Sequence, residues 1–258
     1  MKADSSRWLL VFVCLLFTLS VRAEGPTDLR KVIPLIKPSV VAVGTFQLTR
    51  SPQFRFLGTG FAVKDGTIIV TNAHVVPGVL DLEERESLAV ALPGDGRRTL
   101  VRLVQSLASD PAHDLALLKL PGEPLPALSL ASERDGASEG QPIGFTGFPI
   151  GAVLGLTPVT HAGIVSAITP IVIPQGNART LNPAVIRRLG DAFDVLQLDA
   201  TAYPGNSGSP VFDVDSGKVL GIVNMVFVKG SKENVLTKPS GITYAIPVRY
   251  LDALLAKQ

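Results

Sequence analysis

Short runs of β-branched and aromatic residues, separated by glycine, proline and aspartate, restrict the fold of this chain more than any other feature. Runs of this kind and spacing are typical of an all-β sandwich or barrel, and not of alternating strands and helices. They occupy residues 40–48, 54–63, 67–72, 88–92, 98–105, 142–148, 159–168, 195–198, 209–212, 219–228 and 242–246. The sequence therefore predicts an all-β fold.

The runs form two blocks separated by a stretch with the composition of a linker. Residues 121–140 contain three prolines and the polar segment Ser132-Glu133-Arg134-Asp135-Gly136. Proline and clustered polar residues interrupt strands and favour loops. We therefore expect a first β block over about 38–120, a linker over about 121–140 and a second block over about 141–247.

Helices are expected only outside the β blocks. Four apolar residues stand at helical spacing behind Pro247 and predict a closing helix over about 247–258, namely Val248, Leu251, Leu254 and Leu255. Residues 27–36 predict a short N-terminal helix on similar grounds. The least strand-like stretch, 170–194, holds a candidate helical turn at 181–189; a loop of this length is expected to be either functional or a surface insertion.

The N-terminus has the pattern of a secretory signal peptide. Basic residues precede an apolar run over 8–19, and Val21-Arg22-Ala23 places small residues where signal peptidase would cut. The run is short for a bilayer span, so an uncleaved anchor is the less favoured alternative. We therefore expect residues 1–23 to be removed, and we expect no stable membrane span in the mature chain, 24–258.

Cysteine usage and charge indicate the compartment. Cys14, the only cysteine, lies within the expected signal peptide, so the mature chain would carry no disulfide. An exported chain without disulfides indicates the bacterial periplasm, with secretion as the alternative. Without residues 1–23 the basic and acidic side chains balance, and nothing suggests nucleic acid as a partner.

Three polar residues stand in the order His, Asp, Ser, which is one of the chain orders of a hydrolytic triad. They are His74 within Thr71-Asn72-Ala73-His74-Val75-Val76, Asp114 within 113–118, and Ser207 within Gly205-Asn206-Ser207-Gly208-Ser209-Pro210. A serine hydroxyl is a poor nucleophile at neutral pH. It needs an imidazole to accept its proton and a carboxylate to hold that imidazole in the right tautomer.

Chain order argues against other hydrolase classes. All three histidines precede Ser207, whereas an α/β-hydrolase needs its histidine after the serine, and Ser209 breaks the G-x-S-x-G elbow. A subtilisin order would require Asp65, but Asp65-Gly66 between two apolar runs predicts a hairpin turn. HExxH and Cys/His clusters are absent from the sequence, so we expect no metal.

Together these motifs resemble the protease domain of the trypsin-like serine proteases of the HtrA/Deg type, over nearly the whole mature chain. The matching stretches are Gly58-Thr59-Gly60-Phe61, 71–76, 114–118, 163–166, 199–200 with 204–208, and 244–247. The resemblance implies two six-stranded antiparallel β-barrels with a short C-terminal helix and an active site between the barrels. It further implies a serine endopeptidase that acts on unfolded or extended polypeptides without a cofactor.

The resemblance also implies residue roles. Ser207 would attack the scissile carbonyl, His74 would take and return the proton, and Asp114 would orient the imidazole. Backbone N–H groups of Gly205 and Ser207 would form the oxyanion hole. The substrate pocket would involve Thr201, Ala202, Val223 and Asn224, whose lack of charge favours a small or medium aliphatic side chain. His113 and His161 are expected to be non-catalytic.

The sequence departs from the family pattern in three places. Ser209 replaces a glycine expected two residues after the nucleophile. The neutral Asn206 cannot pair with a newly freed N-terminal amine, which favours ordering of the loop by substrate or partner over zymogen clipping. The chain ends at Gln258, so we expect no C-terminal PDZ domain, and a homotrimer is left open because residues 24–38 offer no aromatic anchor.

Two further functions are compatible with the same motifs. One is a catalytically quiet protease-fold protein with a binding or chaperone-like role. The other is an esterase, which shares the acyl-transfer mechanism. The intact His, Asp and Ser set favours the endopeptidase over both.

Overall fold

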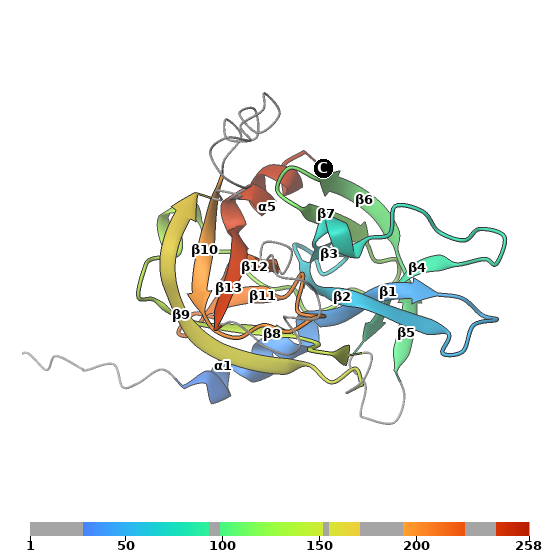
Figure 1. The fold of residues 1–258 in the computed structure, drawn as a ribbon, viewed down its shortest axis with the longest axis horizontal. Coiled ribbons are helices and arrows are strands. Elements are labelled where there is room, and N and C mark those ends of the chain that lie inside the picture. Colours follow the sequence, from blue (N-terminus) through green and yellow to red (C-terminus); the bar gives the residue numbers. More distant parts are fainter. Residues whose placement is uncertain (1–27, 93–98, 152–154, 171–192, 225–240, 258) are drawn as a thin grey trace, which may run out of the picture.

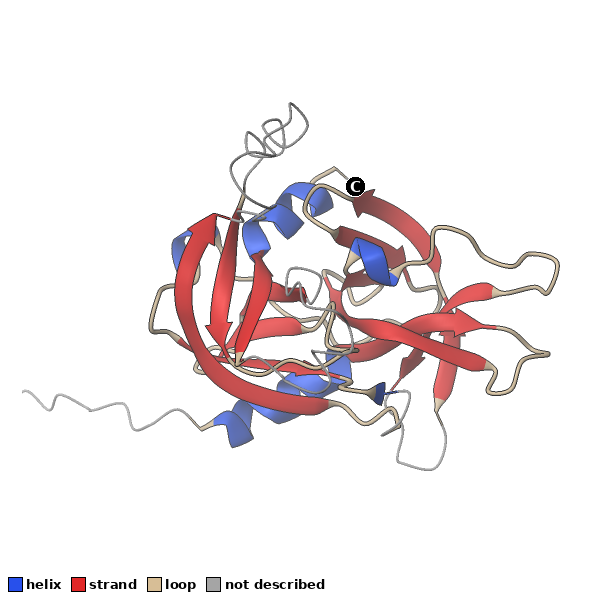
Figure 2. Cartoon of the chain, viewed as in Figure 1, coloured by secondary structure: helices blue, strands red, loops and turns tan. Residues whose placement is uncertain are grey.

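Two β units stand side by side in the computed structural model, which describes residues 28–92, 99–151, 155–170, 193–224 and 241–257 (Figures 1 and 2). The predicted signal peptide, 1–23, and most of the stretch 170–194 lie outside the described residues. The predicted all-β class with a short C-terminal helix is confirmed.

The first unit is a seven-stranded antiparallel sheet in the order β5-β4-β1-β2-β3-β7-β6. Its strands are β1 (Val40–Phe46), β2 (Phe54–Val63), β3 (Ile68–Thr71), β4 (Ser87–Leu92), β5 (Leu100–Leu103), β6 (Gln105–Asp110) and β7 (Leu115–Lys119). The two outer strands, β5 and β6, are separated only by Val104, whose N–H donates to the Leu88 carbonyl at 3.0 Å. One continuous segment thus supplies both edges of the sheet, which is why it has seven strands and not the six expected.

The second unit is a closed barrel in the order β10-β13-β12-β11-β8-β9. Its strands are β8 (Pro142–Gly147), β9 (Val159–Pro170), β10 (Asp194–Asp199), β11 (Pro210–Asp213), β12 (Val219–Asn224) and β13 (Ile242–Pro247). This is the six-stranded antiparallel barrel that the sequence predicted.

Strand β1 shows why several runs lack the alternation of a half-exposed strand. All residues from Val40 to Thr45 are buried. Val41 and Val43 belong to a core inside the first unit, whereas Val40 and Ala42 belong to the larger core shared with the second unit. Both faces of the strand are therefore apolar because each faces a different core.

In the described part of the chain, two eight-residue helices flank the units. In α1 (Leu29–Ile36), the Asp28 side chain caps the helix by accepting from the Arg30 N–H at 3.1 Å. Helix α5 (Val248–Leu255) buries the four apolar residues that predicted it and contacts β6, β12 and β13, so it bridges the units. Among the described residues, no helix combines the length and apolar character needed to cross a bilayer.

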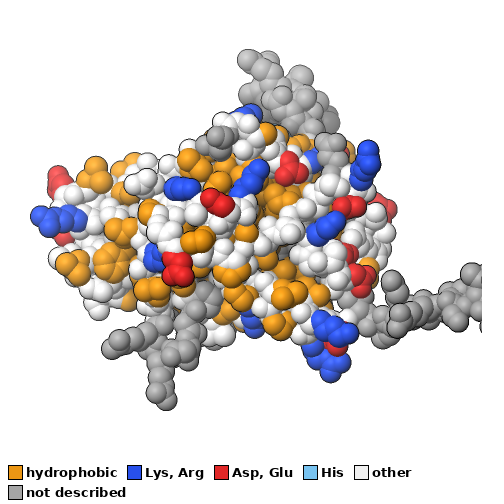
Figure 3. Space-filling model, turned by 180° about the vertical axis from the view of Figure 1, so that it is seen from behind, with side chains coloured by type: hydrophobic (Ala, Val, Ile, Leu, Met, Phe, Trp, Pro, Cys, Tyr) orange, Lys and Arg blue, Asp and Glu red, His pale blue; other side chains and the backbone are white. Residues whose placement is uncertain are grey.

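One face of the molecule carries charges of both signs. On the face opposite to the view of Figure 1, acidic and basic side chains are interspersed among apolar ones (Figure 3). That face therefore offers no broad area of a single charge within the described part of the chain.

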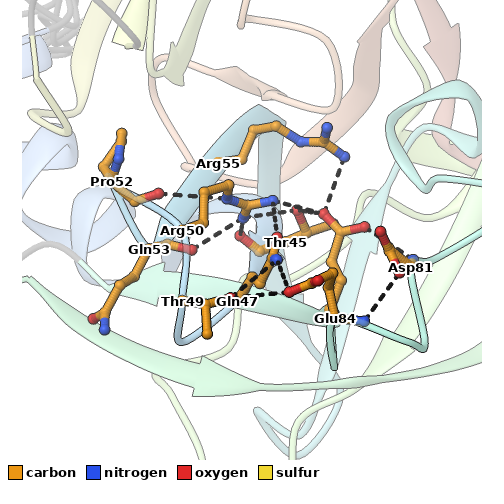
Figure 4. A network of polar contacts seen from close by, with 10 residues as sticks. Thr45, Gln47, Thr49, Arg50, Pro52, Gln53, Arg55, Asp81 and Glu84 are labelled. Carbon is orange, nitrogen blue, oxygen red and sulfur yellow. Dashed lines mark hydrogen bonds and ion pairs between the residues drawn. The ribbon is translucent and has the colours of Figure 1, made fainter.

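A network of polar contacts ties the β1–β2 hairpin to the segment before β4 (Figure 4). Glu86 is only 7% exposed, and its Oε1 accepts from Thr45 Oγ1 at 2.6 Å and from Arg50 at 2.8 Å. Arg55 adds an ion pair at 3.1 Å. These hydrogen bonds, led by the one from Thr45, lower the pKa of Glu86 from 4.5 to about 2.

We expect Glu86→Gln to lower the free energy of unfolding at pH 7 by about 3 kcal/mol, because it removes the buried charge that pairs with Arg50 and Arg55. Because the pKa of Glu86 is lower in the folded state, its charge stabilises the folded protein fully above pH 4.5. That stabilisation is lost as the pH falls from about 4.5 to about 2. Urea unfolding at pH 7 and pH 3 measures both effects.

Glu84→Gln is the matched control, because Glu84 is an exposed neighbour in the same network. It should change stability by less than about 0.5 kcal/mol. Equal losses in the two variants would contradict a special role for Glu86.

Candidate active site

His74 and Asp114 form the tightest polar pair of the site. His74 Nδ1 lies 2.6 Å from Asp114 Oδ2, and the His74 backbone N–H donates to Asp114 Oδ1 at 2.8 Å. His74 lies in a 3₁₀ turn (Ala73–Val75) that follows β3, and Asp114 lies in the turn between β6 and β7. Because β3 and β7 are paired, these two turns meet at one end of the sheet. The Asp114 carboxylate thereby holds both the ring and the backbone of His74.

Backbone geometry at Asp114 aims this carboxylate. Its φ is +54°, in the left-handed region that aspartate tolerates better than most residues. The Asp114 carbonyl accepts from the Asn72 side-chain amide and from the Ala73 N–H, both at 3.1 Å. Two hydrogen bonds to one carbonyl stabilise a conformation that costs of order 1 kcal/mol or more by itself.

Ser207 lies in a compact turn before β11 and is 6% exposed. The turn is held by the Asn206 N–H, which donates to the Tyr203 carbonyl at 2.9 Å, and by the Ser209 N–H, which donates to the Asn206 carbonyl at 3.0 Å. Gly205 has φ of +101°, and a Cβ there would collide with the Phe148 carbonyl. Glycine is therefore required at 205 for both conformation and space.

Two backbone donors in this turn are unengaged. Among the hydrogen bonds of the described residues, the N–H groups of Gly205 and Ser207 have no acceptor. The Pro204 carbonyl accepts from the Ile150 N–H at 2.7 Å. In a trans peptide the N–H points opposite to the carbonyl, so this bond directs the Gly205 N–H away from Ile150. Free N–H groups on either side of Asn206 are what an oxyanion hole needs.

Asn224 connects the two units at the site. It ends β12, is fully buried, and its Nδ2 donates to Asp114 Oδ2 at 2.7 Å. The preceding residue, Val223, accepts from the Gly208 N–H at 2.9 Å. Asp114 is thus linked through β12 to the residue that follows Ser207. Sequence reasoning assigned Asn224 to the substrate pocket and missed this contact, because the two residues are far apart in the chain.

Of the other expected pocket residues, Ala202 and Val223 belong to the core that the two units share. Val223 is fully buried and Ala202 is 4% exposed, whereas Thr201 is half-buried. The Ala202 N–H donates to Thr243 Oγ1 at 3.1 Å. Their position beside the nucleophile turn is compatible with a pocket wall, and the pocket itself stays a prediction.

No hydrogen bond joins the His74 ring to Ser207 among the contacts of the described residues, although Gly58 lies close to both the Ser207 carbonyl and the side chain of Val75, the residue after His74. The other two histidines are engaged elsewhere. His113 pairs with Asp110 at 2.7 Å and stacks on Tyr250 with ring centroids 4.3 Å apart. His161 stacks on Phe145 at 4.8 Å, and burial lowers its pKa.

Ser209, which stands where a glycine was expected, is fully buried. Its hydroxyl lies so close to Gly147 that a Cβ there would collide with it. A glycine at 147 therefore accommodates the extra side chain. Asn206 is also fully buried and neutral. The predicted Asp65-Gly66 hairpin turn is present between β2 and β3, where Asp65 accepts from the Thr67 N–H at 2.9 Å.

Metal ligands do not gather in the described part of the chain, where no group of three or more His, Cys, Asp or Glu could hold an ion. The groups available for chemistry are the His74–Asp114 pair, the Ser207 hydroxyl and the two backbone N–H groups of Gly205 and Ser207.

Comparisons with known proteins agree with this arrangement. The model of the family described as trypsin-like peptidase domain matches residues 58–222. Two proteins named "Probable periplasmic serine endoprotease DegP-like", from Halomonas elongata and Chlamydia trachomatis, are each 33% identical over 77% of this chain. The chain spans about a third, 34%, of the length of each.

Solved structures show the same fold. The HtrA-type protease AlgW with decapeptide has a TM-score of 0.63 and 25% identity, covering 89% of this chain and 67% of that one. The serine endoprotease from Yersinia pestis has a TM-score of 0.62 and 24% identity, covering 90% of this chain and 66% of that one.

Proposed function

Because this chain belongs to the trypsin-like peptidase family, we propose that it is a serine endopeptidase that cleaves polypeptides through Ser207, His74 and Asp114. The observation that carries the proposal is the pair of unengaged N–H groups at Gly205 and Ser207, on the turn that presents the serine. A binding protein has no need of two free donors beside a nucleophile, whereas acyl transfer requires them.

The reaction follows from these positions. The Ser207 Oγ attacks the scissile carbonyl carbon as His74 Nε2 takes its proton, a contact that we expect to form when substrate closes the site. The negative oxygen of the tetrahedral intermediate accepts hydrogen bonds from Gly205 and Ser207. Asp114 keeps the proton of neutral His74 on Nδ1 and stabilises the imidazolium that forms.

The intermediate then collapses as the C–N bond breaks. His74 donates its new proton to the departing amine, which leaves the acyl group as an ester on Ser207. Water enters, gives a proton to His74 and attacks the ester, and the serine is released with its proton restored. No cofactor takes part in either half of the reaction.

Substrate and location follow as parts of the same proposal. Thr201, Ala202 and Val223 offer no charge, so a small or medium aliphatic side chain is proposed before the cleaved bond. Relatives named periplasmic serine endoproteases support an exported, periplasmic location. The natural substrates would then be unfolded or extended polypeptides of the envelope.

The proposal is tested by offering the purified protein casein, an internally quenched peptide with alanine or valine before the cleavable bond, and a matched ester. We expect the casein and the peptide to be cleaved. Pretreatment with a fluorophosphonate should lower the rate of cleavage by at least about 100-fold. A metal chelator should change that rate by less than about twofold.

Two results would overturn the proposal. Hydrolysis of the ester alone would identify an esterase. A folded protein that cleaves none of the three substrates and does not react with the fluorophosphonate would have a binding role.

A further inference from the structure

Thr59 makes an unusual set of contacts across the junction of the two units. It lies on β2 in the first unit, between two glycines, and is fully buried. Its N–H donates to the Ser207 carbonyl at 2.8 Å, and its Oγ1 donates to the Gly205 carbonyl at 2.7 Å. The same Oγ1 accepts from the Phe148 N–H at 3.2 Å. One residue therefore holds both the nucleophile turn and the segment after β8.

The carbonyls that Thr59 holds belong to two particular peptide units. The Gly205 carbonyl lies in the unit between the two N–H groups that would bind the oxyanion, and the Ser207 carbonyl lies in the unit that follows the second N–H. Because peptide units are planar, fixing these two carbonyls restricts the direction of the Ser207 N–H between them. Thr59 is thus placed to set the donor geometry without touching the substrate.

The Thr59 carbonyl extends the connection toward His74. It accepts from Thr71 Oγ1 at 2.7 Å, in a fully buried hydrogen bond. Thr71 ends β3, and the 3₁₀ turn that carries His74 begins two residues later. Thr59 and Thr71 therefore connect the turn that carries Ser207 to the strand that leads to His74.

The backbone at Gly208, directly after Ser207, packs closely against Thr59 and Thr71. Gly208 has φ of +88°, and a Cβ there would collide with the Thr59 carbonyl and lie 2.6 Å from Thr71 Oγ1. The glycine lets the backbone after Ser207 approach the first unit closely enough for the Thr59 hydrogen bonds to form. The distance between the nucleophile turn and β2 is thereby fixed.

We propose that Thr59 is a positioning residue whose hydroxyl aligns the Ser207 N–H, one of the two oxyanion donors, relative to His74. The hydroxyl both donates and accepts, which fixes its orientation, and the branched side chain restricts its rotamer. The effect on catalysis rests on the proposed function, whereas the effect on the turn does not. Valine at 59 keeps the shape but leaves the Gly205 carbonyl and the Phe148 N–H without this partner.

The first test is hydrogen exchange of the purified protein followed by mass spectrometry. We expect Thr59→Val to speed exchange in peptides covering 203–209 by about tenfold or more, and Thr59→Ser to restore most of the protection. Thr45→Val is the control, because Thr45 is an equally buried threonine whose hydroxyl bonds Glu86 in the first unit. Unchanged exchange in Thr59→Val, or an equal increase in Thr45→Val, would overturn the proposal.

The second test is peptide hydrolysis per folded molecule. We expect Thr59→Val to lower kcat by about 10- to 100-fold with KM changed by less than about threefold, since a misdirected donor weakens the transition state and not substrate binding. Thr59→Ser should recover most of the rate. An active wild type with unchanged kcat in Thr59→Val would contradict the positioning role. An inactive wild type with the predicted exchange change would overturn only the endopeptidase.

Discussion

Replacing Ser207 by alanine is expected to lower kcat for peptide hydrolysis by about 10,000- to 1,000,000-fold. Alanine removes the nucleophile but leaves the turn in place, because the hydrogen bonds of the turn join backbone groups of other residues and the Thr59 N–H bonds the carbonyl of residue 207, not its side chain. The residual rate would come from direct attack of water on the scissile carbonyl, with the two N–H groups still stabilising the oxyanion that forms. Progress curves with the quenched peptide, at enzyme concentrations raised to detect the residual rate, measure the loss.

Ser166→Ala is the matched control for this variant. Ser166 is an exposed serine on β9, and it is not one of the residues proposed for catalysis. It should retain the wild-type rate within about twofold, and both variants should unfold at the wild-type urea concentration. A Ser207→Ala protein that still cleaves peptide at a tenth of the wild-type rate would exclude Ser207 as the nucleophile.

Replacing Asp114 by asparagine should lower kcat by about 10,000-fold near pH 7. In the native site Oδ1 accepts from the His74 N–H, while Oδ2 faces both His74 Nδ1 and the Asn224 amide. An asparagine has one oxygen for these two positions, so its NH₂ group must face a donor in either orientation. With the NH₂ at the Oδ2 position, His74 Nδ1 must become an acceptor, and its proton moves to Nε2, where it blocks uptake of the serine proton.

Asp110→Asn is a close control, because Asp110 and His113 form a second His–Asp pair at 2.7 Å. That pair stacks against Tyr250 and takes no part in the proposed chemistry. Its loss should change kcat by less than about threefold. Similar losses in Asp110→Asn and Asp114→Asn would contradict the assignment of Asp114 as the carboxylate that orients the base.

The strands were predictable where local composition and tertiary burial agree. The run 54–63 coincides with β2, and the four apolar residues after Pro247 form the buried face of α5. Two strands of the first sheet were not predicted. Strand β7, Leu115–Lys119, is buried but holds no β-branched or aromatic residue. Strand β6 has a largely polar sequence, Gln105-Ser106-Leu107-Ala108-Ser109-Asp110, and lies on the exposed edge of the sheet. Its position comes from pairing with β7, which no local pattern encodes.

Within the site, the sequence identified the residues of the catalytic set but not the residues that hydrogen-bond to them. Motifs singled out His74, Asp114 and Ser207, but the roles of Asn224 and Thr59 depend on contacts between units. Asn224 is 110 residues from Asp114, and Thr59 is 146 residues from Gly205. Such contacts arise only when β12 lies beside the turn that carries Asp114 and β2 lies beside the turn that carries Ser207. The glycines flanking Thr59 were the one available signal, since they indicate close approach of another chain segment.

Peptide mapping after fluorophosphonate treatment is the most direct measurement of whether this site performs acyl transfer. The proposed mechanism predicts one adduct per molecule, on Ser207 and not on the neighbouring Ser209, and its formation should be at least about 1,000-fold slower in His74→Ala. A folded wild-type protein without an adduct, or one labelled equally fast in His74→Ala, would contradict the mechanism.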